Sequence, residues 1–177
     1  MMKKILILIT CLSLFSGAVF AQSQAEISRD NEGNKVLKGI ISRKELESDT
    51  AFSWWAENLR GYTPQSQALI ELKKNHDIEF IAFIGTWCSD SKFIIPKFYS
   101  FIDAAGFPAD RITLIGVDRS KKTLSHLAEA MNIVDVPTII VMKDGKEAGR
   151  VVEYGKYGLF DKELGEIIAS IPASPGQ

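Results

Sequence analysis

The sequence predicts an α/β domain with a central mixed β-sheet, helices on both faces and an N-terminal helical extension. Short apolar segments at 78–85 and 111–117 alternate with stretches of helical spacing, an order typical of parallel strands joined by helices. An Asp-Gly pair at 144–145 between two further strand candidates predicts an antiparallel hairpin. The 177 residues suit one globular domain, and a hydrophobic content of 46% with a net charge of -1 is typical of a soluble protein.

Residues 1–21 have the layout of a secretory signal peptide. Lys3 and Lys4 precede an apolar run, and the small residues Val19 and Ala21 lie three and one before a candidate cleavage site. We therefore expect an exported protein, periplasmic in a Gram-negative host and otherwise secreted.

Two alternatives to cleavage stay open. A membrane anchor would need roughly 20 apolar residues, and this run is short and contains Gly and Ser. A lipoprotein cysteine at Cys11 would follow Thr10, which is larger than the small residue usual at that position. Both are weaker interpretations than a cleaved signal peptide, and the cleavage site itself is left open.

The segment from 22 to 50 is interpreted as a polar lead-in followed by a short strand and helix extension. Residues 22–35 are polar without periodicity, so we expect a mobile lead-in there. A short strand is expected at 36–41. The main domain is predicted to cover 51–172, with a C-terminal tail at 173–177.

The elements of the main domain follow from apolar spacing. Apolar residues at helical spacing predict helices around 52–59 and, after Pro64, around 68–72. The eight-residue apolar run at 78–85 predicts a strand buried on both faces. The elements expected after it are a helix at 89–105, a strand at 111–117, a helix at 124–131, strands at 138–142 and 148–154, and a helix at 160–171.

Cysteine usage draws attention to one residue. The chain has two cysteines, and removal of residues 1–21 would leave Cys88 alone, which excludes a disulfide or a multi-cysteine zinc site within the mature chain. Cys88 lies between a predicted strand and the N-terminus of a helix, where unpaired amides favour a thiolate. A reactive thiol and a small buried apolar side chain are both consistent with the cysteine alone.

The surroundings of Cys88 resemble the thioredoxin superfamily. The segment 86–92 (TWCSDSK) resembles the active-site turn, in which tryptophan precedes the first cysteine of a CxxC motif, and Pro96 resembles the proline that kinks the following helix. Residues 134–138 (VDVPT) resemble the cis-proline loop, and 139–146 resemble the strand and hairpin after it. The similarity spans roughly 78–171 and implies a thioredoxin-like fold.

Two departures from the family pattern limit the chemistry. The second cysteine falls on Ser91, which gives a monothiol Cys-x-x-Ser motif, and the buried acid of many thioredoxins falls on Ala82. Asp90 places a carboxylate inside the turn, where like-charge repulsion disfavours a thiolate and opposes the helix terminus. Cys88 could therefore form a mixed disulfide with a substrate but could not resolve it alone.

The resemblance implies a thiol–disulfide oxidoreductase of monothiol type with Cys88 as nucleophile. Ser91 either donates a hydrogen bond to the thiolate or is a small residue of the first helical turn, and Asp90 is either a local acid or base or a carboxylate that complements the helix dipole. Trp87, Val136 and Pro137 would bind the substrate, with a cis Pro137 exposing the backbone of Val136. The alternative is a redox-inactive thioredoxin-fold module that binds clients or senses redox state.

The expected partners follow from this chemistry. They are client proteins with disulfides or thiols, and an external low-molecular-weight thiol such as glutathione or a reductase protein. The charge balance offers no basic excess for nucleic acid, and one mature cysteine with two scattered histidines predicts neither a metal site nor a cofactor. No stable membrane span is expected after cleavage.

Overall fold

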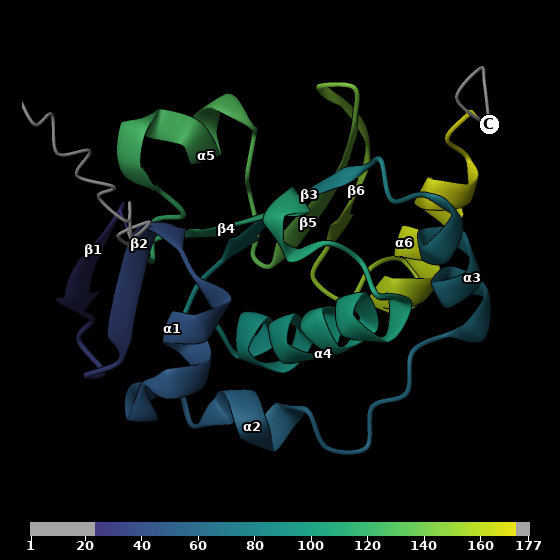
Figure 1. Ribbon diagram of the computed structural model, residues 1–177. Helices are drawn as coiled ribbons and strands as arrows, with labels where there is room; N and C mark the ends of the chain where they lie inside the picture. The colour runs from purple at the N-terminus through teal and green to yellow at the C-terminus, as the bar shows by residue number, and fades with distance from the viewer. Residues whose placement is uncertain (1–23, 173–177) are drawn as a thin grey trace, which may run out of the picture.

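The computed structural model describes residues 24–172, which form a six-stranded mixed sheet with helices on both faces (Figure 1). The strand order is β1-β2-β4-β3-β5-β6. The strands are β1 (Gln24–Arg29), β2 (Lys35–Ile41), β3 (Glu79–Ile84), β4 (Ile112–Gly116), β5 (Thr138–Lys143) and β6 (Lys146–Val152). The α-helices are α1 (Arg43–Ser48), α2 (Trp54–Asn58), α3 (Ser66–Lys74), α4 (Ser89–Ala105), α5 (Leu127–Ala130) and α6 (Phe160–Ala169), with 3-10 turns at Thr50–Phe52, Ala109–Arg111 and Leu124–His126.

The centre of the sheet confirms the predicted mixed architecture. β3 runs parallel to β4 and antiparallel to β5, and β5 continues into β6 as an antiparallel hairpin. Asp144 and Gly145 both have positive φ, at 51° and 72°, which is the backbone that a two-residue hairpin turn requires. The antiparallel register places Phe83 opposite Thr138, so the end of β3 lies beside the start of β5.

The prediction of a mobile lead-in over 22–35 is wrong for the part that the structure describes. Strand β1 pairs with β2 over its whole length, from Gln24 opposite Ile40 to Arg29 opposite Lys35. The Asp30 carboxylate closes the connecting turn by accepting from the backbone N–H groups two and four residues later. β1 is an edge strand held by backbone hydrogen bonds to β2. Its side chains therefore need not alternate between apolar and polar, and the sequence contains no strand signal there.

The N-terminal segment continues the central sheet. The strand predicted at 36–41 is β2, and its residues Gly39–Ile41 pair antiparallel with β4. Gly116 in β4 allows this approach, because a Cβ atom built there would overlap the carbonyl oxygen of Leu37. The helical extension is also present, as α1, the 3-10 turn after it and α2.

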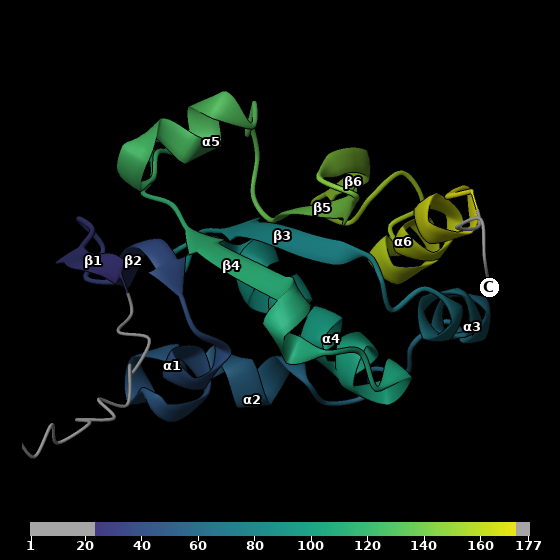
Figure 2. The same ribbon diagram turned by 45° about the horizontal axis from the view of Figure 1, so that its top comes forward.

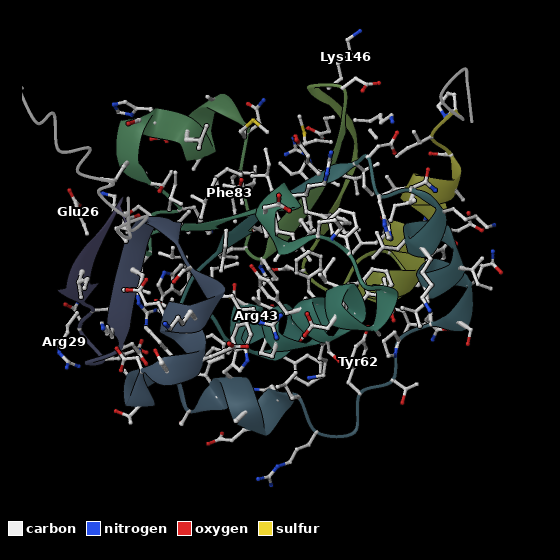
Figure 3. The ribbon with its side chains drawn as sticks, viewed as in Figure 1. Glu26, Arg29, Arg43, Tyr62, Phe83 and Lys146 are labelled. Carbon is white, nitrogen blue, oxygen red and sulfur yellow. The ribbon has the colours of Figure 1, made fainter. Side chains whose placement is uncertain are left out.

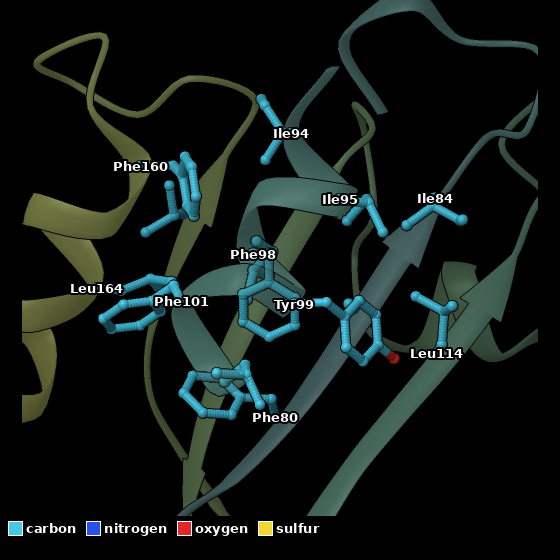
Figure 4. Packing of buried hydrophobic residues seen from close by; sticks show 14 of the residues in the cluster. Phe80, Ile84, Ile94, Ile95, Phe98, Tyr99, Phe101, Leu114, Phe160 and Leu164 are labelled. Carbon is cyan, nitrogen blue, oxygen red and sulfur yellow. The ribbon is translucent and has the colours of Figure 1, made fainter. Parts of the chain in front are cut away.

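One face of the sheet carries the larger apolar cluster (Figure 4). Phe80 and Ala82 of β3 point to this face and are fully buried. They meet Phe98 and Phe101 of α4 and Leu164 of α6, and the rings of Phe80 and Phe98 lie 5.3 Å apart in an edge-to-face arrangement. Helices α1, α2 and α3 add residues to the same cluster, so most helices cover one side.

The opposite face is covered by α5 and its neighbouring loops (Figure 2). Phe83 of β3 packs there with Ala128 and Ile133, so that β3 is buried on both faces as its apolar run predicts. The helix predicted at 124–131 is shorter than expected. Ser125 and His126 adopt left-handed backbone angles, which leaves a 3-10 turn followed by a helix of four residues.

Ion pairs and hydrogen bonds attach the extension and α6 to this core (Figure 3). Arg43 of α1 donates to both carboxylate oxygens of Asp103 in α4, at 2.7 and 2.8 Å. The hydroxyl of Tyr62 donates to the buried carboxylate of Asp161 in α6, and burial together with this bond raises the pKa of Tyr62.

The segments predicted as leader (1–21) and tail (173–177) lie outside the described residues. Between residues 24 and 172, no helix has the length and apolar character needed to cross a membrane.

Substituting Gly116→Ala tests the contact between β2 and β4. We expect it to lower the free energy of unfolding by about 1–3 kcal/mol, because the new methyl group displaces β2. Urea denaturation followed by circular dichroism measures this. Thr113→Ala, at an exposed site on the same strand, should cost less than about 1 kcal/mol, and equal effects of the two changes would contradict the close approach.

Candidate functional site

Cys88 lies at the N-cap of α4, a helix of 17 residues, directly after the turn that leaves β3. Its backbone N–H donates to the oxygen of Gly85 at 2.9 Å, and its carbonyl oxygen accepts the first helical bond from Lys92. The thiol is half-buried and forms no disulfide.

The loop before β5 meets Cys88 from the other side. The Val136–Pro137 peptide bond is cis, as the resemblance implies. The Cys88 thiol donates a hydrogen bond to the carbonyl oxygen of Val136 at 3.1 Å. The structure therefore brings Cys88, Val136 and Pro137 together across 48 residues of sequence. Thr138 secures the loop, because its hydroxyl donates to the oxygen of Asp135 at 2.7 Å.

Ser91 is fully buried and faces the backbone of the turn. Its Oγ accepts a hydrogen bond from the N–H of Gly85 at 3.1 Å. This contact gives Ser91 a structural role in closing the turn between β3 and α4. The hydrogen bonds among residues 24–172 include none between Ser91 and the sulfur of Cys88.

Trp87 is half-buried and fixed at its indole nitrogen. Nε1 donates to the oxygen of Val117 at 3.0 Å, and the ring packs with the smaller apolar cluster. A side chain at Gly85 would place its Cβ 2.7 Å from the indole ring, so the ring needs a glycine there. The guanidinium of Arg119 lies 5.1 Å from the ring centroid and covers it.

Arg119 is held in turn by the β1–β2 turn. Its guanidinium contacts the carboxylates of Asp30 and Glu32, each at 2.7 Å. Burial of Asp30 raises its pKa, but hydrogen bonds from Asn34, Arg119 and the turn backbone outweigh burial and lower the pKa to about 2. The N-terminal hairpin therefore reaches the tryptophan beside Cys88 through one arginine.

Thr86 links the same hairpin to the turn between β3 and α4. Its hydroxyl donates to the oxygen of Lys35 at 2.8 Å and accepts from the N–H of Leu37 at 3.2 Å. Because Thr86 is buried, these two bonds satisfy backbone groups of β2 that water does not reach.

Asp90 contacts the segment that follows β6. Its Oδ1 accepts a hydrogen bond from the Tyr154 hydroxyl at 3.1 Å and lies 3.5 Å from the Ser89 hydroxyl. The ring of Tyr154 also packs on Phe93, with centroids 5.8 Å apart. The predicted site residues thus gather around Cys88, and each of them has a defined contact.

Sequence reasoning missed Arg119, Thr86 and Tyr154. Arg119 follows a strand end, where ligand-binding residues gather in α/β folds, and this signal could have found it. Thr86 belongs to the 86–92 motif, but its hydrogen bonds to β2 were not predicted. Tyr154 fell inside the strand predicted at 148–154, but β6 ends at Val152 and Glu153 has a φ of 52°.

The described part of the chain offers no group of three or more His, Cys, Asp or Glu side chains that could hold a metal ion. A surface hollow of about 670 Å³ lies beside β1 and the turn at Thr50–Phe52 and is lined by none of the predicted site residues.

Comparisons with known proteins place this geometry among thioredoxins. The family model for thioredoxin matches residues 66–162. An H-type thioredoxin of Oryza sativa subsp. indica is 32% identical over 108 residues, which cover 59% of this chain and 84% of the rice protein. A thioredoxin of Chlamydia pneumoniae is 34% identical over 84 residues, covering 48% and 72% of the two chains.

A solved structure extends the likeness of the fold. A Pseudomonas aeruginosa protein of unknown function aligns with a TM-score of 0.51 at 14% identity, over 74% of this chain and 90% of that one. The coverage exceeds that of the two thioredoxins above, but the low identity makes this a likeness of fold alone.

The Asp30 ion pair predicts a specific loss of stability in acid. Asp30 has a lowered pKa in the folded state, so its contribution is present above about pH 4 and is lost as the pH falls toward 2. We expect Asp30→Asn to be less stable than the wild type at pH 6 and to approach it at pH 2.5. Urea denaturation at both pH values measures the gap, and a constant gap would contradict the assignment.

Proposed function

Because the chain belongs to the thioredoxin family, we propose that it is an exported thiol–disulfide oxidoreductase of monothiol type. The observation that carries the proposal is the position of Cys88, half-buried at the N-terminus of α4 and 3.1 Å from the oxygen of Val136. Members of the family act on thiols and disulfides, and the relatives named above are thioredoxins.

The first step is attack by the Cys88 thiolate on a client disulfide. A new bond forms between Cys88 Sγ and one client sulfur, the client disulfide breaks, and the other client sulfur leaves as a thiolate. Ionisation of Cys88 removes the hydrogen bond to Val136, because only the thiol can donate it. The helix terminus compensates by stabilising the charge.

The second step needs a thiol from outside. Ser91 occupies the position of a resolving cysteine, and Cys88 is the one cysteine within residues 24–172. An external thiolate attacks Cys88 Sγ and releases the reduced client, and a second external thiol then frees Cys88 as its own disulfide forms. One client disulfide and two external thiols thus give a client dithiol and one small disulfide.

The half-buried indole of Trp87 and the loop at Val136–Pro137 flank the sulfur and supply the client-binding surface in this proposal. The clients are proteins with a disulfide in an extended segment, and the reducing partner is a low-molecular-weight thiol or a reductase.

Installing a second cysteine tests the monothiol mechanism. With a disulfide peptide and no external thiol, we expect the wild type to stop as a mixed disulfide at Cys88, whereas Ser91→Cys resolves it by forming an internal disulfide. Mass spectrometry of the intact protein distinguishes the two products. Ser91→Ala, which adds no thiol, should behave like the wild type.

Two outcomes would contradict the proposal. Release of reduced peptide by the wild type without any external thiol would exclude the monothiol mechanism. A wild-type chain that forms no mixed disulfide under any condition, while Cys88→Ser is indistinguishable from it, would favour the redox-inactive client-binding module.

Export has a test of its own. We propose that residues 1–21 are removed, on the basis of the basic start, the apolar run and the small residues at 19 and 21. N-terminal sequencing of the protein isolated from its native host should begin at or near Gln22. A retained Met1, or a lipid attached to Cys11, would contradict cleavage at this site.

A further inference from the structure

A tyrosine from the far end of the sheet contacts the active-site turn. Tyr154 follows β6, and its hydroxyl donates to Oδ1 of Asp90 at 3.1 Å. Asp90 lies two residues beyond Cys88 in the first turn of α4. This bond therefore joins the turn that carries the nucleophile to a segment 64 residues away.

The tyrosine is fixed by its ring and by its backbone neighbour. Its ring packs on Phe93 in α4, and the ammonium group of Lys97 lies 3.4 Å from the Phe93 centroid on the same helix. The N–H of Glu153 donates to the oxygen of Pro137 at 2.7 Å, which ties this segment to the cis-proline loop. Two independent contacts thus hold Tyr154 between α4 and the cis-proline loop.

The bond changes the charge that a thiolate at Cys88 would meet. A free carboxylate in the first helical turn after Cys88 would disfavour the thiolate by like-charge repulsion. The Tyr154 hydroxyl that donates to Oδ1 of Asp90 draws part of the carboxylate's negative charge toward itself. Burial, the hydrogen bond to Asp90 and the charges of Asp90, Cys88 and Glu153 raise the pKa of Tyr154, so the phenol stays protonated and remains a donor.

We propose that Tyr154 is a positioning residue that acts through Asp90 to favour the reactive thiolate of Cys88. The inference rests on the proposed function, since it concerns the reactivity of the same sulfur. It gives Asp90 an electrostatic role in place of an acid or base, with Oδ1 accepting the hydrogen bond of the phenol.

The other charged groups near Cys88 set the background for the test. Glu153 precedes Tyr154, Asp135 pairs with Lys121 at 3.5 Å, and Lys92 lies one helical turn beyond Cys88. None of these groups is altered in the variants below, so their contributions to the pH profile stay constant.

The experiment measures alkylation of Cys88 by iodoacetamide, an uncharged reagent, between pH 4 and 10 in the full chain. Mass spectrometry of the peptide that contains Cys88 gives the rate, and the midpoint of its rise reports the thiolate. Asp90→Asn should lower the midpoint by about half a pH unit. Tyr154→Phe should raise it by a smaller amount, because the carboxylate loses its donor.

The double variant separates positioning from a general structural effect. If Tyr154 acts through Asp90, Tyr154→Phe should shift nothing once Asp90 is already asparagine. Tyr157→Phe is the matched control, because Tyr157 is exposed on the same loop and its ring packs against lysines. It should leave the midpoint at the wild-type value.

The possible results divide cleanly. An unchanged or lowered midpoint in Tyr154→Phe, or an equal shift with and without Asp90, would overturn the inference. Failure of the proposed function would look different, since Cys88 would then form no mixed disulfide although its alkylation profile still responded to Tyr154 and Asp90.

Discussion

The antiparallel pairing of β3 with β5 is the constraint on which the site depends. Its register places Phe83 opposite Thr138, so the last residues of β3 and the first residues of β5 lie at the same end of the sheet. The turn after β3 therefore delivers Cys88 to the N-terminus of α4, and the loop before β5 delivers Val136 to the same place. A register shift of one residue would turn the side chains of one strand to the opposite face of the sheet and displace the two groups relative to each other.

The β1–β2 hairpin also stabilises this end of the sheet. Thr86 forms hydrogen bonds with backbone groups of β2. Arg119 binds a carboxylate of the β1–β2 turn and packs on the indole of Trp87. The family model covers residues 66–162, so Thr86 and Arg119 lie inside the matched region, whereas the β1–β2 hairpin that contacts them lies outside it. This hairpin is thus part of the structure around Cys88 and extends the sheet by two strands.

The sequence predicted the parts of the fold that rest on apolar runs and turn chemistry. The strand at 78–85, the helix at 89–105 and the Asp-Gly hairpin are all present, because burial on two faces and positive φ leave direct signals. β1 was missed because an edge strand is held by its backbone pairing with β2.

Within the site, the sequence predicted that Cys88 and the cis-proline loop lie together, since the motif and the loop are local patterns. It could not locate the donor to Asp90, because Tyr154 reaches it only after β6 ends and Glu153 turns the chain. The hydrogen bond of Ser91 to Gly85 was equally hidden, as it depends on how tightly the turn closes.

We propose that Cys88 exchanges disulfides with an external thiol as its only resolving partner. The most direct measurement is the lifetime of a purified Cys88–peptide mixed disulfide, followed by mass spectrometry as glutathione is added in increasing concentration. The account predicts a stable adduct without glutathione and a release rate that rises in proportion to its concentration. Spontaneous release at a rate independent of the external thiol would contradict it.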